Sequence, residues 1–212
     1  MNDPADTPPP RGLSAESPKY GPRFFEALRR FDEENAQDPN LLVVEEVAHP
    51  QELLYAERLT DWVLRLDPKA SESLLLAARS QHIRRWTIPR ASYEMTRAGY
   101  LRWRADLKQF HAAKSAEILH QVGYDEETVA RVRELNLKKQ LGRDPDCQTL
   151  EDALCLVTLQ YQLADLVAKT PPAKIIEILQ KTWKKMSKAA HERALALHFS
   201  EVEKQLIEQA LR

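Results

Sequence analysis

Glycine is scarce in this chain, and its scarcity limits the possible folds more than any other feature does. Only 5 of the 212 residues are glycine, whereas 43% are apolar and 30% are charged. Folds with many tight turns, or with a phosphate loop of the Rossmann or P-loop kind, need glycine where φ is positive or where the backbone approaches a ligand. The composition therefore favours an all-α fold, and the apolar content is sufficient for a sizeable core.

The prolines divide the chain into segments. Six of the 13 prolines lie in residues 1–22, where no apolar periodicity is present, so we predict a short flexible leader over residues 1–20. Most of the others stand where one apolar repeat of 3.6 residues ends and another begins. Residues 41–47 are the one stretch that resembles a strand. We predict a single helical domain over residues 21–212, with helices near 22–37, 50–66, 70–85, 98–121, 125–140, 148–169, 172–187 and 188–210.

Cysteine usage and the chain start indicate the compartment. Cys147 and Cys155 are too few for a disulfide scaffold and lack zinc or redox spacing, which fits a reducing environment. The proline-rich start is not typical of a signal peptide, and no apolar run is long enough to span a membrane. We expect a soluble, cytoplasmic protein without membrane contact, and no feature of the sequence indicates its oligomeric state.

Helical phase places four polar side chains on apolar faces: those of Glu52, His82, His111 and Asp152. Glu151, beside the last of these, is predicted to face outward. Burying an unpaired carboxylate or imidazole is costly, so such groups usually find each other, a hydrogen-bond partner or a metal. Two imidazoles and two carboxylates are a mixed donor set for a divalent metal such as Mn, Fe, Ni or Zn. The alternative is that each group is satisfied separately by hydrogen bonds.

The order of these residues resembles that of the HD superfamily of all-α metal phosphohydrolases. That superfamily has a first His, a later His-Asp doublet, often a further His, and a final Asp. Here Gln81 and His82 stand in the places of the doublet, and Glu52 stands in the place of the first His. His111 resembles the additional His and Asp152 the final Asp. The resemblance implies an HD-like bundle in which these residues hold a metal, although the doublet is altered and the first His is replaced.

A second resemblance extends over most of the chain. Six strings occur in the order typical of the family designated domain of unknown function 4202: FDEENAQDPN, HPQELLYAERLTDW, AARSQHIRRWTIPR, GYLRWR, QTLEDALCLV and KTWKKMSK. Taken together they are specific. This resemblance implies an all-α domain but no particular reaction.

Charge is distributed unevenly along a chain whose net charge is only −1. Residues 1–78 hold 8 basic and 15 acidic residues, whereas residues 79–108 hold 8 basic and 2 acidic residues, with Trp and Tyr interleaved. Seven of those eight are arginines, whose planar guanidinium groups suit bidentate phosphate binding and stacking on bases. We predict a phosphate-bearing ligand, a small molecule or nucleotide, with RNA as a further possibility. The predicted binding residues are Arg79, Arg85, Arg104 and Trp103; the alternative is a solvated face paired with the acidic first third.

Residues 185–188 read Lys-Met-Ser-Lys, like the start of the KMSKS loop of class I aminoacyl-tRNA synthetases. The accompanying HIGH motif needs a glycine and a second His, which residues 81–84 do not supply. We therefore do not predict synthetase activity, and we expect these lysines at a helix C-terminus, where cations are favoured.

Our leading hypothesis is a divergent HD-like, metal-dependent phosphohydrolase that acts on a small phosphorylated substrate. His82, His111 and Asp152 would be its catalytic residues, and Glu52 would complete the metal-binding set. The main alternative is a non-catalytic helical module that binds a nucleotide or RNA through a degenerate HD-like site. A third possibility is a scaffold that recruits partners through its leader and a long helix near 188–210.

Overall fold

The computed structural model describes Leu13 and residues 19–212, and these residues confirm the all-α prediction. The predicted leader falls almost entirely outside the described residues. No helix of the described part is both long enough and apolar enough to cross a membrane. The elements are α1 (Pro22–Asn35), β1 (Leu41–Val44), β2 (Val47–Pro50), α2 (Gln51–Leu66), α3 (Glu72–Ser80), α4 (Arg97–Val122), α5 (Glu126–Leu137), α6 (Pro145–Tyr161), α7 (Leu163–Lys169), α8 (Pro172–Trp183), α9 (Lys188–Leu195) and α10 (Glu201–Leu211).

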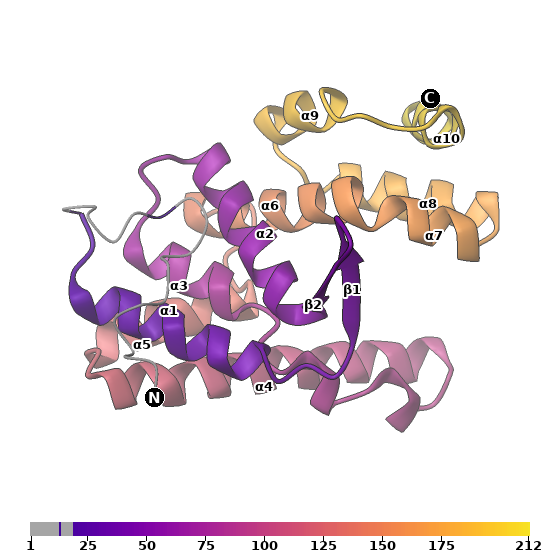
Figure 1. Cartoon of the computed structure of the whole chain (residues 1–212). Coiled ribbons are helices and arrows are strands. Elements are labelled where there is room, and N and C mark those ends of the chain that lie inside the picture. The colour runs from indigo at the N-terminus through magenta and orange to yellow at the C-terminus, as the bar shows by residue number, and fades with distance from the viewer. Residues whose placement is uncertain (1–12, 14–18) are drawn as a thin grey trace.

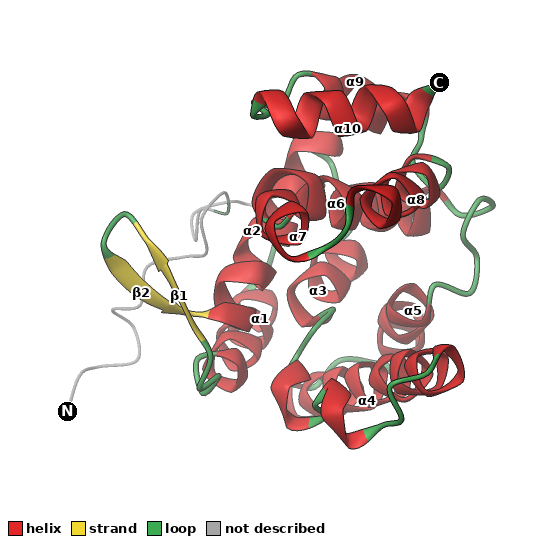
Figure 2. Cartoon of the chain, turned by 90° about the vertical axis from the view of Figure 1, so that its right-hand side faces the viewer, coloured by secondary structure: helices red, strands yellow, loops and turns green. Residues whose placement is uncertain are grey.

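Helix α3 lies at the centre of the fold and packs against α1, α2, α5 and α6. Its residues 74–78 are completely buried, because this short run is apolar on every side. In Figures 1 and 2, α4 lies along one side of the molecule and α9 and α10 lie along the opposite side, with α2, α3 and α6 between them. The core therefore extends through the middle helices α2, α3 and α6.

Several boundaries differ from the sequence prediction. The helix expected over 70–85 ends at Ser80, where the chain enters a run of turns. The segment expected over 148–169 is divided at Gln162 into α6 and α7. The long helix expected near 188–210 is also divided, because α10 has its own start: the side chains of Ser200 and Glu203 form a capping box there. Periodicity alone does not reveal such breaks.

The predicted strand belongs to a two-stranded hairpin. Strands β1 and β2 pair antiparallel, with Leu41 opposite Pro50 and Val44 opposite Val47. Glu45 and Glu46 form the turn with φ values of 50° and 68°, a conformation that favours Gly or Asn over Glu. Figure 2 shows the hairpin projecting from the helical body. Its second strand leads directly into α2.

Candidate functional site

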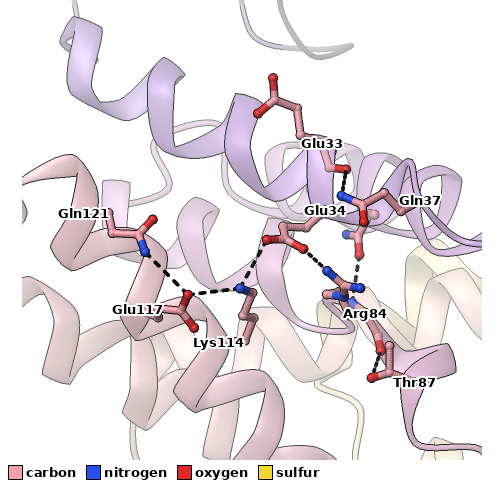
Figure 3. A network of polar contacts seen from close by, with 9 residues as sticks. Glu33, Glu34, Gln37, Arg84, Thr87, Lys114, Glu117 and Gln121 are labelled. Carbon is pink, nitrogen blue, oxygen red and sulfur yellow. Dashed lines mark hydrogen bonds and ion pairs between the residues drawn. The ribbon is translucent and has the colours of Figure 1, made fainter.

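The turn after α3 is fixed by a polar network. Arg84 has a left-handed backbone with φ of 50°, and its backbone N–H donates to Oδ1 of Asn35 over 3.0 Å. Its guanidinium donates to Glu34 over 2.6 Å, and Lys114 lies 3.2 Å from the same carboxylate. Figure 3 shows Glu34 between the two cations. Because Asn35 and Glu34 of α1 hold Arg84 in this way, the position of the adjacent Arg85 is also restricted.

Two cavities adjoin at this turn and together form what we call the cleft. They share four lining residues: Tyr55, His82, Arg85 and Gln162. The first, the Glu52 cavity, has a volume of about 260 Å³ and adds Gln51, Glu52, Arg58 and Asp165 to its polar lining. The second, the basic cavity, has a volume of about 400 Å³ and adds Tyr100, Trp103, Arg104, Lys138, Glu151, Lys181 and Lys185. A cleft of this size suits a small molecule.

The basic cavity holds lysines around a buried carboxylate. Glu151 is 5% exposed, which corrects the prediction that it faces outward. Its oxygens lie 2.5 Å from the ammonium nitrogen of Lys138 and 3.4 Å from that of Lys185. Burial alone would raise the pKa of Glu151, but the two ammonium groups outweigh that effect and lower it below the usual value. The ionised carboxylate therefore holds both lysines at the cavity wall.

An aromatic wall completes the basic cavity. The guanidinium of Arg85 lies 4.9 Å from the ring centre of Trp103, whose indole N–H donates to the carbonyl of Ile88 over 2.9 Å. The Trp103 and Tyr100 ring centres are 6.0 Å apart, and the Arg104 guanidinium lies 5.9 Å from the Tyr100 ring. The structure thus brings together Arg85, Trp103 and Arg104, three of the four predicted binding residues.

Glu52 and His82 lie next to each other in the Glu52 cavity. Oε2 of Glu52 is 3.5 Å from Nδ1 of His82, and Oε1 is 3.8 Å from Nε of Arg85. The His82 ring stacks on Tyr55 with 4.3 Å between centres. Burial raises the pKa of Glu52 to about 7, although Arg85 opposes the shift. Burial, together with Arg85 and other cations, lowers the pKa of His82 well below its usual value, so its imidazole is neutral at pH 7.

His111 lies behind His82, with 5.7 Å between the two ring centres. Its Nδ1 is 2.9 Å from the carbonyl oxygen of Ile83, and because a carbonyl only accepts, Nδ1 carries the proton. Nε2 is buried and has no hydrogen-bond partner among the described residues. Burial lowers the pKa of His111 to about 3, so this imidazole is also neutral at pH 7.

Asp152 is buried as predicted, but its carboxylate is used elsewhere. Oδ1 accepts from the backbone N–H of Ser187 over 2.8 Å and from the side-chain amide of Gln148 over 2.9 Å. Oδ2 accepts from the Ser187 hydroxyl over 2.5 Å. Asp152 therefore ties α6 to the start of α9, and it does not join the two histidines.

Arg79 also lies outside the cleft lining. It is 1% exposed, and its guanidinium donates to both carboxylate oxygens of Asp32 over 2.5 and 2.7 Å. A carboxylate oxygen of Glu57 also lies 3.7 Å from the Arg79 guanidinium. A buried Arg needs such partners, and here it links α3 to α1 and α2 instead of facing a ligand.

The predicted metal ligands are only partly assembled. Glu52, His82 and His111 are neighbours, whereas Asp152 is engaged by Ser187. Within the described residues, no three His, Cys, Asp or Glu side chains are arranged so that they could hold a metal ion. The donor set does not fit a metal with the side chains in these positions.

Comparison with known proteins identifies the family of this chain. A family model described as domain of unknown function (DUF4202) matches residues 25–207. The chain belongs to this family. The matched range includes all six strings on which the resemblance was based and every lining residue of the cleft. No curated protein and no solved structure matched the chain.

Sequence reasoning missed much of the basic side of this DUF4202 domain. Lys138 follows α5, Lys181 belongs to α8, and Lys185 lies between α8 and α9, so no local spacing connects them. One signal was present. The Lys-Met-Ser-Lys stretch predicts lysines at a helix C-terminus, and Lys185 does follow the end of α8, where its side chain also lines the basic cavity. The prediction is wrong for Lys188, which is the first residue of α9.

Proposed function

We propose that this DUF4202 domain binds a small phosphorylated molecule, such as a nucleotide, in the cleft. The supporting observation is the lining of the basic cavity. Five cationic side chains face it in the described part of the chain, against the single carboxylate of Glu151: Arg85, Arg104, Lys138, Lys181 and Lys185. A cavity of about 400 Å³ with this excess of positive charge suits a phosphorylated small ligand.

The chemistry of the wall supports a phosphate in particular. Guanidinium groups form bidentate hydrogen bonds with phosphate oxygens, and lysines add point charges. Trp103 and Tyr100 supply ring faces on which a planar group could stack. RNA is the alternative ligand, since a nucleotide of a single strand offers the same groups. The volume of the cavity, about 400 Å³, favours a small molecule.

A ligand panel tests this proposal. Nucleoside mono-, di- and triphosphates, sugar phosphates and a short RNA would be screened by their effect on the melting temperature of the full chain. We expect at least one phosphorylated small molecule to raise it. Arg104→Ala should weaken that binding by about tenfold or more, because a charge-assisted hydrogen bond is lost. Arg102→Ala is the matched control on α4, since Arg102 does not line the cleft. Failure of every ligand, or equal binding by both variants, would contradict the proposal.

Hydrolysis of the same ligand is a second candidate function. It is the function that the resemblance in residue order to the HD superfamily implies. The observation that favours it is the pair of Glu52 and neutral His82 in the cleft wall. Water would attack phosphorus while neutral His82 takes its proton, the adjacent Glu52 carboxylate would stabilise the imidazolium that forms, and the bond to the leaving oxygen would break. His82 would then return the proton to that oxygen. No step is routed through a metal, because the donor set does not fit one.

Phosphate release decides between the two candidate functions. Protein purified without a His tag would be analysed for metal and assayed on the bound ligand, alone and with Mn, Fe, Ni or Zn. If hydrolysis is the function, His82→Ala should abolish phosphate release but leave ligand binding in place. Stoichiometric metal that is lost in His111→Ala would support the metal-dependent form. If the ligand binds but no phosphate is released under any of these conditions, hydrolysis is excluded and the domain is a binding module.

A further inference from the structure

Phosphate binding leaves the Glu52 cavity unexplained. Glu52 is 4% exposed, and its Oε2 accepts no hydrogen bond within the described residues. Its other oxygen lies 3.8 Å from Arg85, which is longer than a hydrogen bond. A buried carboxylate oxygen without a donor is destabilising by more than a formed hydrogen bond is worth. No donor in the described part of the chain reaches Oε1 either, and because Oε2 is closed off from solvent, Oε1 is the oxygen to which a ligand in the cavity of about 260 Å³ could donate.

The Glu52 cavity and the basic cavity can serve one ligand. Tyr55, His82 and Arg85 line both, so a molecule whose phosphate lies among the lysines needs only to extend past Arg85 to reach Glu52. The Tyr55 and His82 rings, which stack on each other with an angle of 13° between their planes, line both cavities along this route. This arrangement suits an elongated molecule with a planar part.

We propose that the ligand is a nucleotide whose base carries an amino group, as adenine and cytosine do, and that this group donates a hydrogen bond to Glu52. The inference rests on the proposed function, since the phosphate of the same molecule occupies the basic cavity. A neutral amino group fits better than an ammonium group, because Arg58 and Arg85 already balance the carboxylates of Glu52 and Asp165 in this cavity. The side-chain amides of Gln51 and Gln162 can contact the neighbouring ring nitrogens.

Paired ligands test the inference. AMP would be compared by calorimetry with purine riboside 5′-monophosphate, which lacks only the amino group, and CMP with pyrimidin-2-one riboside 5′-monophosphate. We expect one amino-bearing nucleotide to bind about tenfold or more tightly than its partner, because loss of the donor again leaves Glu52 unpaired. Glu52→Leu should remove the preference and Glu52→Gln should reduce it. Asp61→Asn, a change on the same helix outside the cleft lining, should preserve it.

Pyrophosphate separates this inference from the proposed function. Both Glu52 variants should still bind pyrophosphate, which also shows that they are folded, and Asp61→Asn should bind it as the unmodified chain does. If pyrophosphate binds but amino-bearing and deaminated nucleotides bind equally, or neither binds, the inference is overturned and the phosphate site stands. If neither pyrophosphate nor any nucleotide binds the unmodified chain, the proposed function fails and the inference fails with it.

Discussion

Ser187 donates two hydrogen bonds to the carboxylate of Asp152, one from its backbone N–H over 2.8 Å and one from its hydroxyl over 2.5 Å. Ser187 is also the N-cap of α9, and its hydroxyl oxygen accepts from the backbone N–H of Ala190. Gln148 bridges the Asp152 carboxylate and the backbone carbonyl of Lys185. Asp152 therefore determines where the segment that carries Lys185 lies.

Removal of the Ser187 hydroxyl should affect both stability and binding. We expect Ser187→Ala to lower the free energy of unfolding by about 1–3 kcal/mol, because it removes a cap and leaves a buried carboxylate short of a donor. It should also weaken binding of a phosphorylated ligand, since Lys185 is displaced. Urea unfolding and calorimetry measure the two effects. Ser200→Ala, which removes the cap of α10, is the control: it should lower stability and preserve affinity. Equal affinities of the two variants would refute the positioning role of Ser187.

Asn35 should stabilise the turn that carries His82 and Arg85. The side chain is completely buried and accepts from the backbone N–H of Arg84. We expect Asn35→Ala to reduce the free energy of unfolding by about 1–3 kcal/mol, because that N–H loses its acceptor. Gln37→Ala should change it by less than about 0.5 kcal/mol, since Gln37 is exposed. Chemical unfolding compares the variants, and a similar small effect of both would contradict the role assigned to Asn35.

Glu52 should make stability depend on pH. Burial raises the pKa of Glu52 from 4.5 to about 7 in the folded chain. Between pH 4.5 and 7, the folded state therefore holds a proton on Glu52 that the unfolded state has released. The contribution of Glu52 is therefore favourable below pH 4.5 and is lost as the pH rises through 7. Glu52→Gln cannot ionise, so its stability relative to the unmodified chain should rise over this interval, by about 3 kcal/mol at most. Urea unfolding at pH 4.5, 6 and 8 measures the difference, and a difference independent of pH would contradict the assigned shift.

Local pattern predicted the helices and part of the site. Glu52 and His111 were found because each lies on the apolar face of its helix, and helical phase records that directly. His82 was predicted on the same basis, but α3 ends at Ser80, so His82 lines the cleft from the turn that follows the helix. Asp152 was also found to be buried, but its partner Ser187 comes 35 residues later, and periodicity carries no information about such pairs. Glu151 was placed outside because phase assumes one buried face. Consecutive residues 150–157 of α6 are all buried.

The cationic wall required the fold. Arg79 and Arg85 belong to the same basic segment, yet Arg79 forms a buried ion pair with Asp32 and Arg85 faces the cleft. Their different surroundings come from helices distant in sequence. The same holds for Lys138 and Lys185, which meet only because both pair with Glu151. The spacing of residues along the sequence does not predict contacts of this kind between side chains on distant segments.

Calorimetric titration of a nucleotide into the unmodified chain and two double variants tests the central claim most directly. The account predicts saturable binding of one ligand per chain. Arg104→Ala with Lys185→Ala should reduce the affinity by about 100-fold, since two charged contacts to phosphate are lost. Arg102→Ala with Lys204→Ala removes the same charge outside the cleft and should leave the affinity unchanged. Equal affinity of the two double variants, or no binding by the unmodified chain, would contradict the account.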